Sequence, residues 1–209
     1  MEEQAVYEPE IIEEETGLQV KDSNKLQVKR EILDYKTLIE MSTMLAKSTI
    51  LPIQYQNRPE NCFIMLDLAS RMGVSPMVVA QNLFIIQGKP SWSGQAIASL
   101  IRSSEQFKNV ELHYIGEEGK DNWGAYVTAE RNGKTLKGAS VTIKMAKAEG
   151  WYQKSGSKWQ TMPELMLAYR AYTFFGRAYA PELLMGLHAV EEIEDITPNK
   201  SSVVNPFEK

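Results

Sequence analysis

The sequence has few of the residues on which disulfide, metal and nucleophile chemistry depend. It contains one cysteine, Cys62, and two histidines, His113 and His188. A single cysteine excludes an intramolecular disulfide, argues against a cysteine-based metal site and fits a reducing compartment. Neither histidine has a cysteine or a second histidine nearby in the sequence, so zinc sites and histidine-assisted nucleophiles are disfavoured.

Motifs for nucleotides and membranes are also absent. The chain has neither GxxxxGKS/T nor GxGxxG, the two glycine-rich patterns that bind nucleotide phosphates. It has no run of 18 apolar residues, and its N-terminus is acidic, which argues against a transmembrane helix and a secretory signal. We therefore expect a cytoplasmic protein that is not an enzyme and uses neither a cofactor nor a metal.

Charge is segregated along the chain. The formal net charge is −4, but residues 1–16 carry seven acids and no base, and residues 189–209 carry five acids and two bases. Subtracting these from the totals of 27 acids and 23 bases leaves 15 acids and 21 bases in residues 17–188, a net charge of +6. A basic body between acidic ends is typical of nucleic-acid proteins, although acidic ends can also serve solubility alone.

The sequence predicts three parts. Residues 1–30 read as an acidic and polar arm, 31–188 as the main domain, and 189–209 as an acidic tail expected to be disordered. The four acids within 191–195 could suggest a metal cluster, but a solvated terminus is the better interpretation.

Hydrophobic periodicity changes from helical to alternating and back along the main domain. The expected elements are a helix over 34–47, a helical hairpin over 59–83, a short strand over 84–86, a helix over 93–102, strands over 110–114, 123–130 and 134–143, a short helix over 143–150, a long helix over 161–179 and a last short helix from Pro181. Asn132-Gly133 is a strong hairpin signal, residues 88–90 predict a turn, and Thr161 with Glu164 predicts a capping box. The fold class is therefore α+β, with a three-stranded antiparallel meander between helices.

Between Lys144 and Arg177, basic residues are interleaved with aromatic ones. The segment holds six cations against two acids, Glu149 and Glu164. Cations neutralise phosphates and flat rings stack on unpaired bases, so this mixture suits a protein that binds single-stranded nucleic acid. Four of the aromatics have an alternative role in the core of one helix: Tyr169, Tyr172, Phe174 and Phe175.

Three features could contact a nucleic-acid backbone. Residues 88–94 place a cation and a tryptophan beside a helix N-terminus, where N–H groups can hold a phosphate, although a plain turn with a buried ring is equally consistent. The loop 151–158 carries lysines and serines between two tryptophans, which we expect to be exposed there. Arg170 and Arg177 lie seven residues apart on one helix and so share a face, from which they could contact nearby phosphates. The alternative is that they are surface or salt-bridging arginines. The candidate nucleic-acid-binding residues are Lys89, Trp92, Lys144, Lys147, Trp151, Lys154, Ser157, Lys158, Trp159, Arg170 and Arg177.

Two runs of residues resemble a known family. They are RMGVSPMVVAQNLFIIQGKPSWSGQAIASLI and EGWYQKSGSKWQTMPELMLAYRAYTFFGRAYAPELLMG, and together the resemblance covers about 58–195. They are similar to the RecT family of phage single-strand annealing recombinases. In the second run, the matching positions are Gly150-Trp151, Lys158-Trp159, Met162-Pro163, Arg170, Arg177 and Pro181-Glu182.

The resemblance implies a β-meander packed on a long helix, a core like that of lambda Red beta and the annealing rings. It also implies ATP-independent binding of single-stranded DNA, annealing to duplex DNA, and a homo-oligomeric ring or helical filament. A phage exonuclease and the host single-strand binding protein are the implied partners. Only about 20 acidic and polar residues follow the body, where many relatives carry a longer partner-binding domain.

The sequence thus predicts a single-strand annealing protein of phage homologous recombination that works without covalent chemistry. Two alternatives from other classes stay open. A metal-dependent DNA-processing enzyme such as a nuclease would cleave DNA with Mg²⁺. A non-annealing partner-binding module, using the acidic ends, would fail to bind single strands at low salt.

Overall fold

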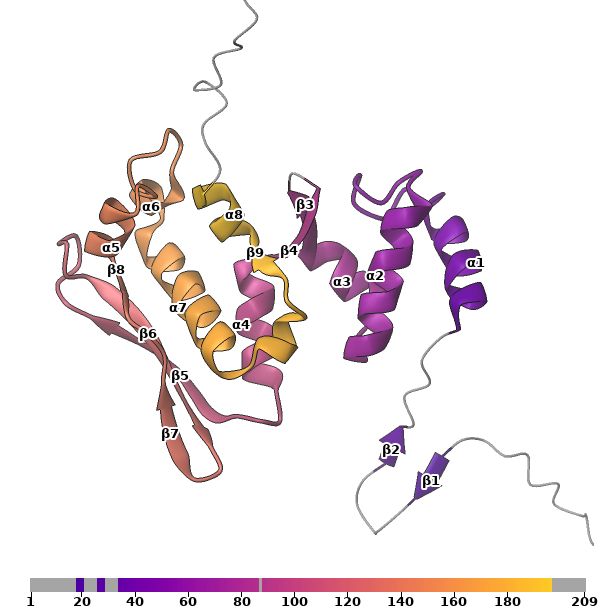
Figure 1. Cartoon of the computed structure of the whole chain (residues 1–209), viewed down its shortest axis with the longest axis horizontal. Helices are drawn as coiled ribbons and strands as arrows, with labels where there is room; N and C mark the ends of the chain where they lie inside the picture. Colours follow the sequence, from indigo (N-terminus) through magenta and orange to yellow (C-terminus); the bar gives the residue numbers. More distant parts are fainter. Residues whose placement is uncertain (1–17, 21–25, 29–33, 87, 197–209) are drawn as a thin grey trace, which may run out of the picture.

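A computed structural model describes residues 18–20, 26–28, 34–86 and 88–196 of the 209-residue chain. These residues form helices and antiparallel strands, which confirms the predicted α+β class. A β-sheet from the middle of the chain lies at one side of the molecule, the first helices of the chain lie at the other, and further helices lie between them (Figure 1). The predicted arm over 1–30 lies outside the described residues, apart from the antiparallel pair β1 (Leu18–Val20) and β2 (Leu26–Val28).

The first helices follow the start and stop signals of the sequence. α1 (Tyr35–Leu45) begins after Asp34, whose carboxylate accepts from the Thr37 N–H at 3.0 Å. α2 (Pro59–Met72) has proline in its first turn and ends at Gly73, which adopts the left-handed conformation with φ 62°. α3 (Pro76–Asn82) packs against α2 and completes the predicted helical hairpin.

Three short strands then form a small sheet that was only partly predicted. β3 (Leu83–Ile86) pairs antiparallel with β4 (Lys89–Trp92), where we expected a turn through Lys89 and Pro90. The chain reverses earlier, at Gly88 with φ 76°, so Pro90 lies in the strand opposite Ile85. β9 (His188–Ala189) pairs parallel to β4.

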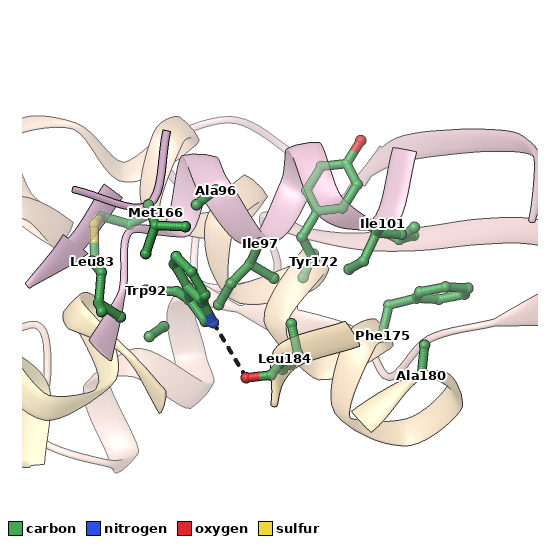
Figure 2. Close-up of a cluster of buried hydrophobic side chains, with 14 of the residues drawn as sticks. Leu83, Trp92, Ala96, Ile97, Ile101, Met166, Tyr172, Phe175, Ala180 and Leu184 are labelled. Carbon is green, nitrogen blue, oxygen red and sulfur yellow. Dashed lines mark hydrogen bonds between the residues drawn. The ribbon is translucent and has the colours of Figure 1, made fainter. Parts of the chain in front are cut away.

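The centre of the core lies between α4 (Gly94–Ser103) and α7 (Pro163–Tyr179), which pack against each other. Figure 2 shows Trp92 at one end of this interface, where its indole N–H donates to the Leu184 carbonyl at 3.2 Å. Ile97 and Ile101 of α4 meet aromatic side chains of α7 along its length (Figure 2). Trp92 therefore takes the buried-ring alternative of the sequence prediction.

The larger sheet has the strand order β5-β6-β7, with β8 also paired to β6. Its members are β5 (Lys108–Ile115), β6 (Gly124–Arg131), β7 (Lys134–Lys137) and β8 (Val141–Thr142). Asn132 and Gly133 form the predicted hairpin turn, with φ 53° and 73°.

The strand predicted over 134–143 is divided into β7 and β8. β7 ends at Lys137, and the next residue, Gly138, still donates to the Val127 carbonyl of β6 at 2.8 Å. A Cβ on Gly138 would lie only 3.2 Å from the Phe175 side chain of α7. α7 packs against β6, whose buried side chains are Ala125, Val127 and Ala129. The close approach of α7 thus favours glycine at position 138.

The last part of the chain is helical. It comprises α5 (Ile143–Ala148), α6 (Lys158–Thr161), α7, the 3₁₀ helix η1 (Pro181–Leu184) and α8 (Val190–Ile196). The predicted capping box is wrong, because Thr161 already belongs to α6 and α7 is preceded by Met162, which makes no side-chain cap.

The predicted disorder from residue 189 is also wrong over 190–196, because α8 buries Val190 and Ile193 against the domain. Residues 197–209 lie outside the described part of the chain. Within the described ranges, no single helix is long and apolar enough to cross a membrane. α2 and α3 reach that length and apolar content only as a pair, and the pair is bent by 119°.

Candidate nucleic-acid interface

The structure separates the predicted site residues into a surface set and a buried set. Lys89, Lys144 and Lys158 are exposed, and Lys147 and Lys154 are half-buried. The buried set comprises Trp92, Trp151, Trp159 and Arg170, with 2%, 8%, 0% and 4% of their surfaces exposed. The lysines therefore remain at or near the surface, whereas Arg170 and the tryptophans do not.

Trp151 and Trp159 are packed against each other beneath their loop, so our expectation that they are exposed is wrong. Their ring centroids lie 5.6 Å apart, and the Arg170 guanidinium carbon lies 4.1 Å from the Trp151 ring centroid. The Trp159 indole N–H donates to Asp195 at 3.2 Å. Because both rings are buried, they anchor the loop and cannot stack on bases in this conformation.

Hydrogen bonds within the loop fix its shape. The Trp151 N–H donates to the Ala146 carbonyl at 2.9 Å, and the Ser157 hydroxyl donates to the Trp151 carbonyl at 2.6 Å. The Gln160 amide donates to the Tyr152 carbonyl at 2.5 Å. The Ser157 hydroxyl proton is therefore already engaged in a hydrogen bond within the loop. The loop residues 154–158 line a polar pocket together with Met166, Glu194 and Asp195.

Four lysines lie in α5, in the following loop and at the start of α6, and we call them the lysine surface: Lys144, Lys147, Lys154 and Lys158. Lys147 donates to Asp121 at 2.5 Å, and this bond raises the pKa of the ammonium group. The Lys158 ammonium lies 3.3 Å from a carboxylate oxygen of Glu194, and that of Lys154 donates to the Glu194 carbonyl at 2.7 Å. Lys89 and Lys144 form no ion pair within the described residues.

The two arginines of α7 share a face, as predicted, and both pair with carboxylates of α8. Arg170 contacts Glu192 at 3.3 Å through Nη1 and makes a second ion pair with Asp195 through Nη2. Arg177 contacts Glu192 at 2.6 Å and donates to His188 Nδ1 at 2.6 Å. Both arginines therefore take the salt-bridging alternative of the sequence prediction, because carboxylates distant in sequence reach them.

Burial raises the pKa of two carboxyl groups of α8. It raises the pKa of Asp195, although Arg170 and the Trp159 N–H act in the opposite direction. It also raises the pKa of Glu191, whose Oε1 accepts from the Gly94 N–H at 3.2 Å. The second oxygen of Glu191 is buried without a hydrogen-bond partner in the described structure.

Sequence reasoning missed a cluster on the larger sheet. The rings of His113 and Tyr126 stack with centroids 5.0 Å apart, and the Lys137 ammonium lies 4.2 Å from the Tyr126 ring centroid. His113 Nε2 lies 2.7 Å from the Thr128 hydroxyl. Alternation along β6 places Tyr126 and Thr128 on the face opposite its buried alanines. The Asn132-Gly133 turn fixes one strand register, but the register of β5 on β6, which places His113 opposite Tyr126, could not be read from the sequence.

No group of three or more His, Cys, Asp or Glu side chains is placed to hold a metal ion in the part of the chain that the structure describes. No protein-family model matches the chain, and no curated protein matches it in sequence. The arrangement of charges and rings is thus the basis for a functional conclusion.

Proposed function

We propose that this protein binds single-stranded DNA and anneals complementary strands without ATP. The observation that carries the proposal is the lysine surface, four cations held within residues 144–158 on a frame that is fixed by buried tryptophans. A DNA strand that neutralises its phosphates on these lysines releases counterions, which drives binding without reading sequence. The net charge of +6 over residues 17–188 favours the same ligand.

Annealing requires bound bases that remain free to pair. With Trp151 and Trp159 inside the protein, their rings do not compete with a complementary strand for base stacking. Cations that hold the phosphates of two strands lower the repulsion between them and so lower the barrier to pairing. The protein's contribution is therefore charge neutralisation and positioning, with no covalent step.

The strand order β5-β6-β7 and the packing of α7 against β6 support a resemblance to the RecT family, which we include in the proposal. The same resemblance is the basis for proposing a homo-oligomer that acts in the host cytoplasm during phage recombination. A phage exonuclease and the host single-strand binding protein are its proposed partners.

Fluorescence anisotropy of a labelled single-stranded oligonucleotide tests the proposal over a range of salt concentrations. We expect log K to fall linearly with log salt concentration, with a slope of about −0.7 for each phosphate neutralised. The Lys144→Ala/Lys147→Ala variant should bind more weakly and with a shallower slope, because two phosphate contacts are lost.

The matched control is Lys36→Ala/Lys47→Ala, which removes two exposed lysines from α1 and the residues just after it. This control should bind like the original protein. A binding constant that does not change with salt, or an equal loss in both double variants, would contradict the assignment of the lysine surface.

A further inference from the structure

Every carboxylate of α8 contacts a group that is suited to holding a phosphate. Glu192 pairs with Arg170 and Arg177, and Asp195 pairs with Arg170. The side chain of Glu194 meets Lys158, and its carbonyl accepts from Lys154. Glu191 accepts from the first N–H of α4. One short helix thus engages four of the candidate DNA-binding cations and one helix N-terminus.

Carboxylate and phosphate oxygens are interchangeable at such positions. The guanidinium fork of arginine matches both groups in two-point geometry, and a lysine ammonium attracts either as a point charge. The N–H groups at the start of a helix also accept either anion. α8 therefore presents its acidic side chains where the phosphates of a bound strand would otherwise lie.

The attachment of α8 has features that permit release. It has seven residues, too few to remain helical alone in water, so undocking and unfolding of this segment coincide. Its apolar anchors are Val190 and Ile193. The buried oxygen of Glu191 that has no hydrogen-bond partner in the described structure weakens the attachment, because an unsatisfied buried polar atom costs free energy.

We propose that α8 is an internal competitor of single-stranded DNA, which pairs with Lys154, Lys158, Arg170 and Arg177 in the free protein and is displaced when a strand binds. The inference rests on the proposed function and adds its regulation. In the free protein the competitor lowers affinity for short or isolated strands, because each phosphate must first replace a carboxylate. Once α8 is released, Arg170 and Arg177 join the lysine surface.

Hydrogen–deuterium exchange of the full chain, with and without a single-stranded oligonucleotide, tests the displacement directly. We expect the amides of 190–196 to exchange faster when DNA is bound, while those of 151–158 become protected. Equal or slower exchange of 190–196 in the complex would overturn the inference. If no oligonucleotide binds at all, the proposed function and this inference both fail. If an oligonucleotide binds but 190–196 exchange no faster, only the inference fails, so the two failures are distinguishable.

The Glu194→Gln variant provides a second test, because its side chain is half-exposed and its replacement disturbs the core little. Affinity for the oligonucleotide should rise about two- to five-fold at low salt, the value of an exposed ion pair, and the gain should vanish at high salt. Glu149→Gln removes the same charge from the exposed end of α5 without touching α8. An equal gain in Glu149→Gln would show a general charge effect and overturn the specific role of α8.

Discussion

At the scale of single residues, Arg170 has the clearest consequence for stability. Its side chain is 4% exposed and is the charge partner of Glu192 and Asp195, which are also buried. We expect Arg170→Ala to lower stability by about 3–5 kcal/mol, because removal of one partner leaves buried charge uncompensated. The thermal midpoint should fall by roughly 6–20 °C in a chain of this length, which differential scanning fluorimetry measures.

Arg71→Ala is the control for this change. Arg71 forms an ion pair with Asp67 at 2.8 Å, but its side chain is 51% exposed. Because exposed ion pairs contribute little to stability, its midpoint should hardly move. Similar midpoints for the original protein and Arg170→Ala would show that Arg170 is not a structural residue in solution.

Glu191 leads to a prediction about pH. Burial raises its pKa above the ordinary value of 4.5, so near that pH the folded protein holds a proton that the unfolded chain has lost. The stability from this group is present below about pH 4.5 and is lost as pH rises through the folded pKa. Glu191→Gln should therefore raise the thermal midpoint at pH 7, and the difference from the original protein should shrink as pH falls.

The measurement is a series of paired melting curves between pH 7 and pH 4.5. Because other carboxylates titrate in both proteins, only the difference between the two curves is informative. A difference that grows on acidification would mean that the carboxylate is stabilised in the fold, contrary to the effect of its burial.

At the scale of elements, the sequence predicted the boundaries that depend on neighbouring residues. It did not predict the contacts between residues that are distant in sequence. Asp34, Gly73 and the Asn132-Gly133 turn act through neighbours in sequence, and each marks an element boundary that the structure confirms. The pairing of β4 with β9 joins residues about 100 positions apart, so no local pattern reveals it. The need for glycine at position 138 likewise depends on Phe175, which belongs to another element.

The contact between α4 and α7 leads to a prediction about how closely these two helices must pack. A Cβ on Gly94 would lie 2.6 Å from Cγ of Tyr169, at the base of the ring, which cannot swing away. Gly94→Ala should therefore separate the two helices and cost about 1–3 kcal/mol, measured by urea unfolding. Ser99→Ala, at an exposed position of the same helix, is the control and should be neutral or slightly stabilising. Equal midpoints for both variants would contradict the close packing.

At the scale of the whole molecule, the sequence shows how charge is distributed along the chain, but it does not show which charged groups pair with each other. The sequence indicates which segment is rich in lysine, and the structure keeps those side chains at or near the surface. It could not reveal that Trp151 and Trp159 are buried, because their cover comes from α7 and α8. It also could not reveal that the acidic residues near the end of the body pair with the arginines of α7. Composition thus indicates a candidate ligand class, which stays a prediction, whereas the partners of each charge depend on tertiary packing.

The most direct test of the central claim is the rate at which two complementary oligonucleotides, labelled with a donor and an acceptor fluorophore, form duplex without ATP. We predict that the protein accelerates energy transfer well above the spontaneous rate, with or without Mg²⁺, and that Lys144→Ala/Lys147→Ala accelerates it less than Lys36→Ala/Lys47→Ala. A rate equal to that of the protein-free reaction, or strands that are shortened when Mg²⁺ is added, would contradict the account.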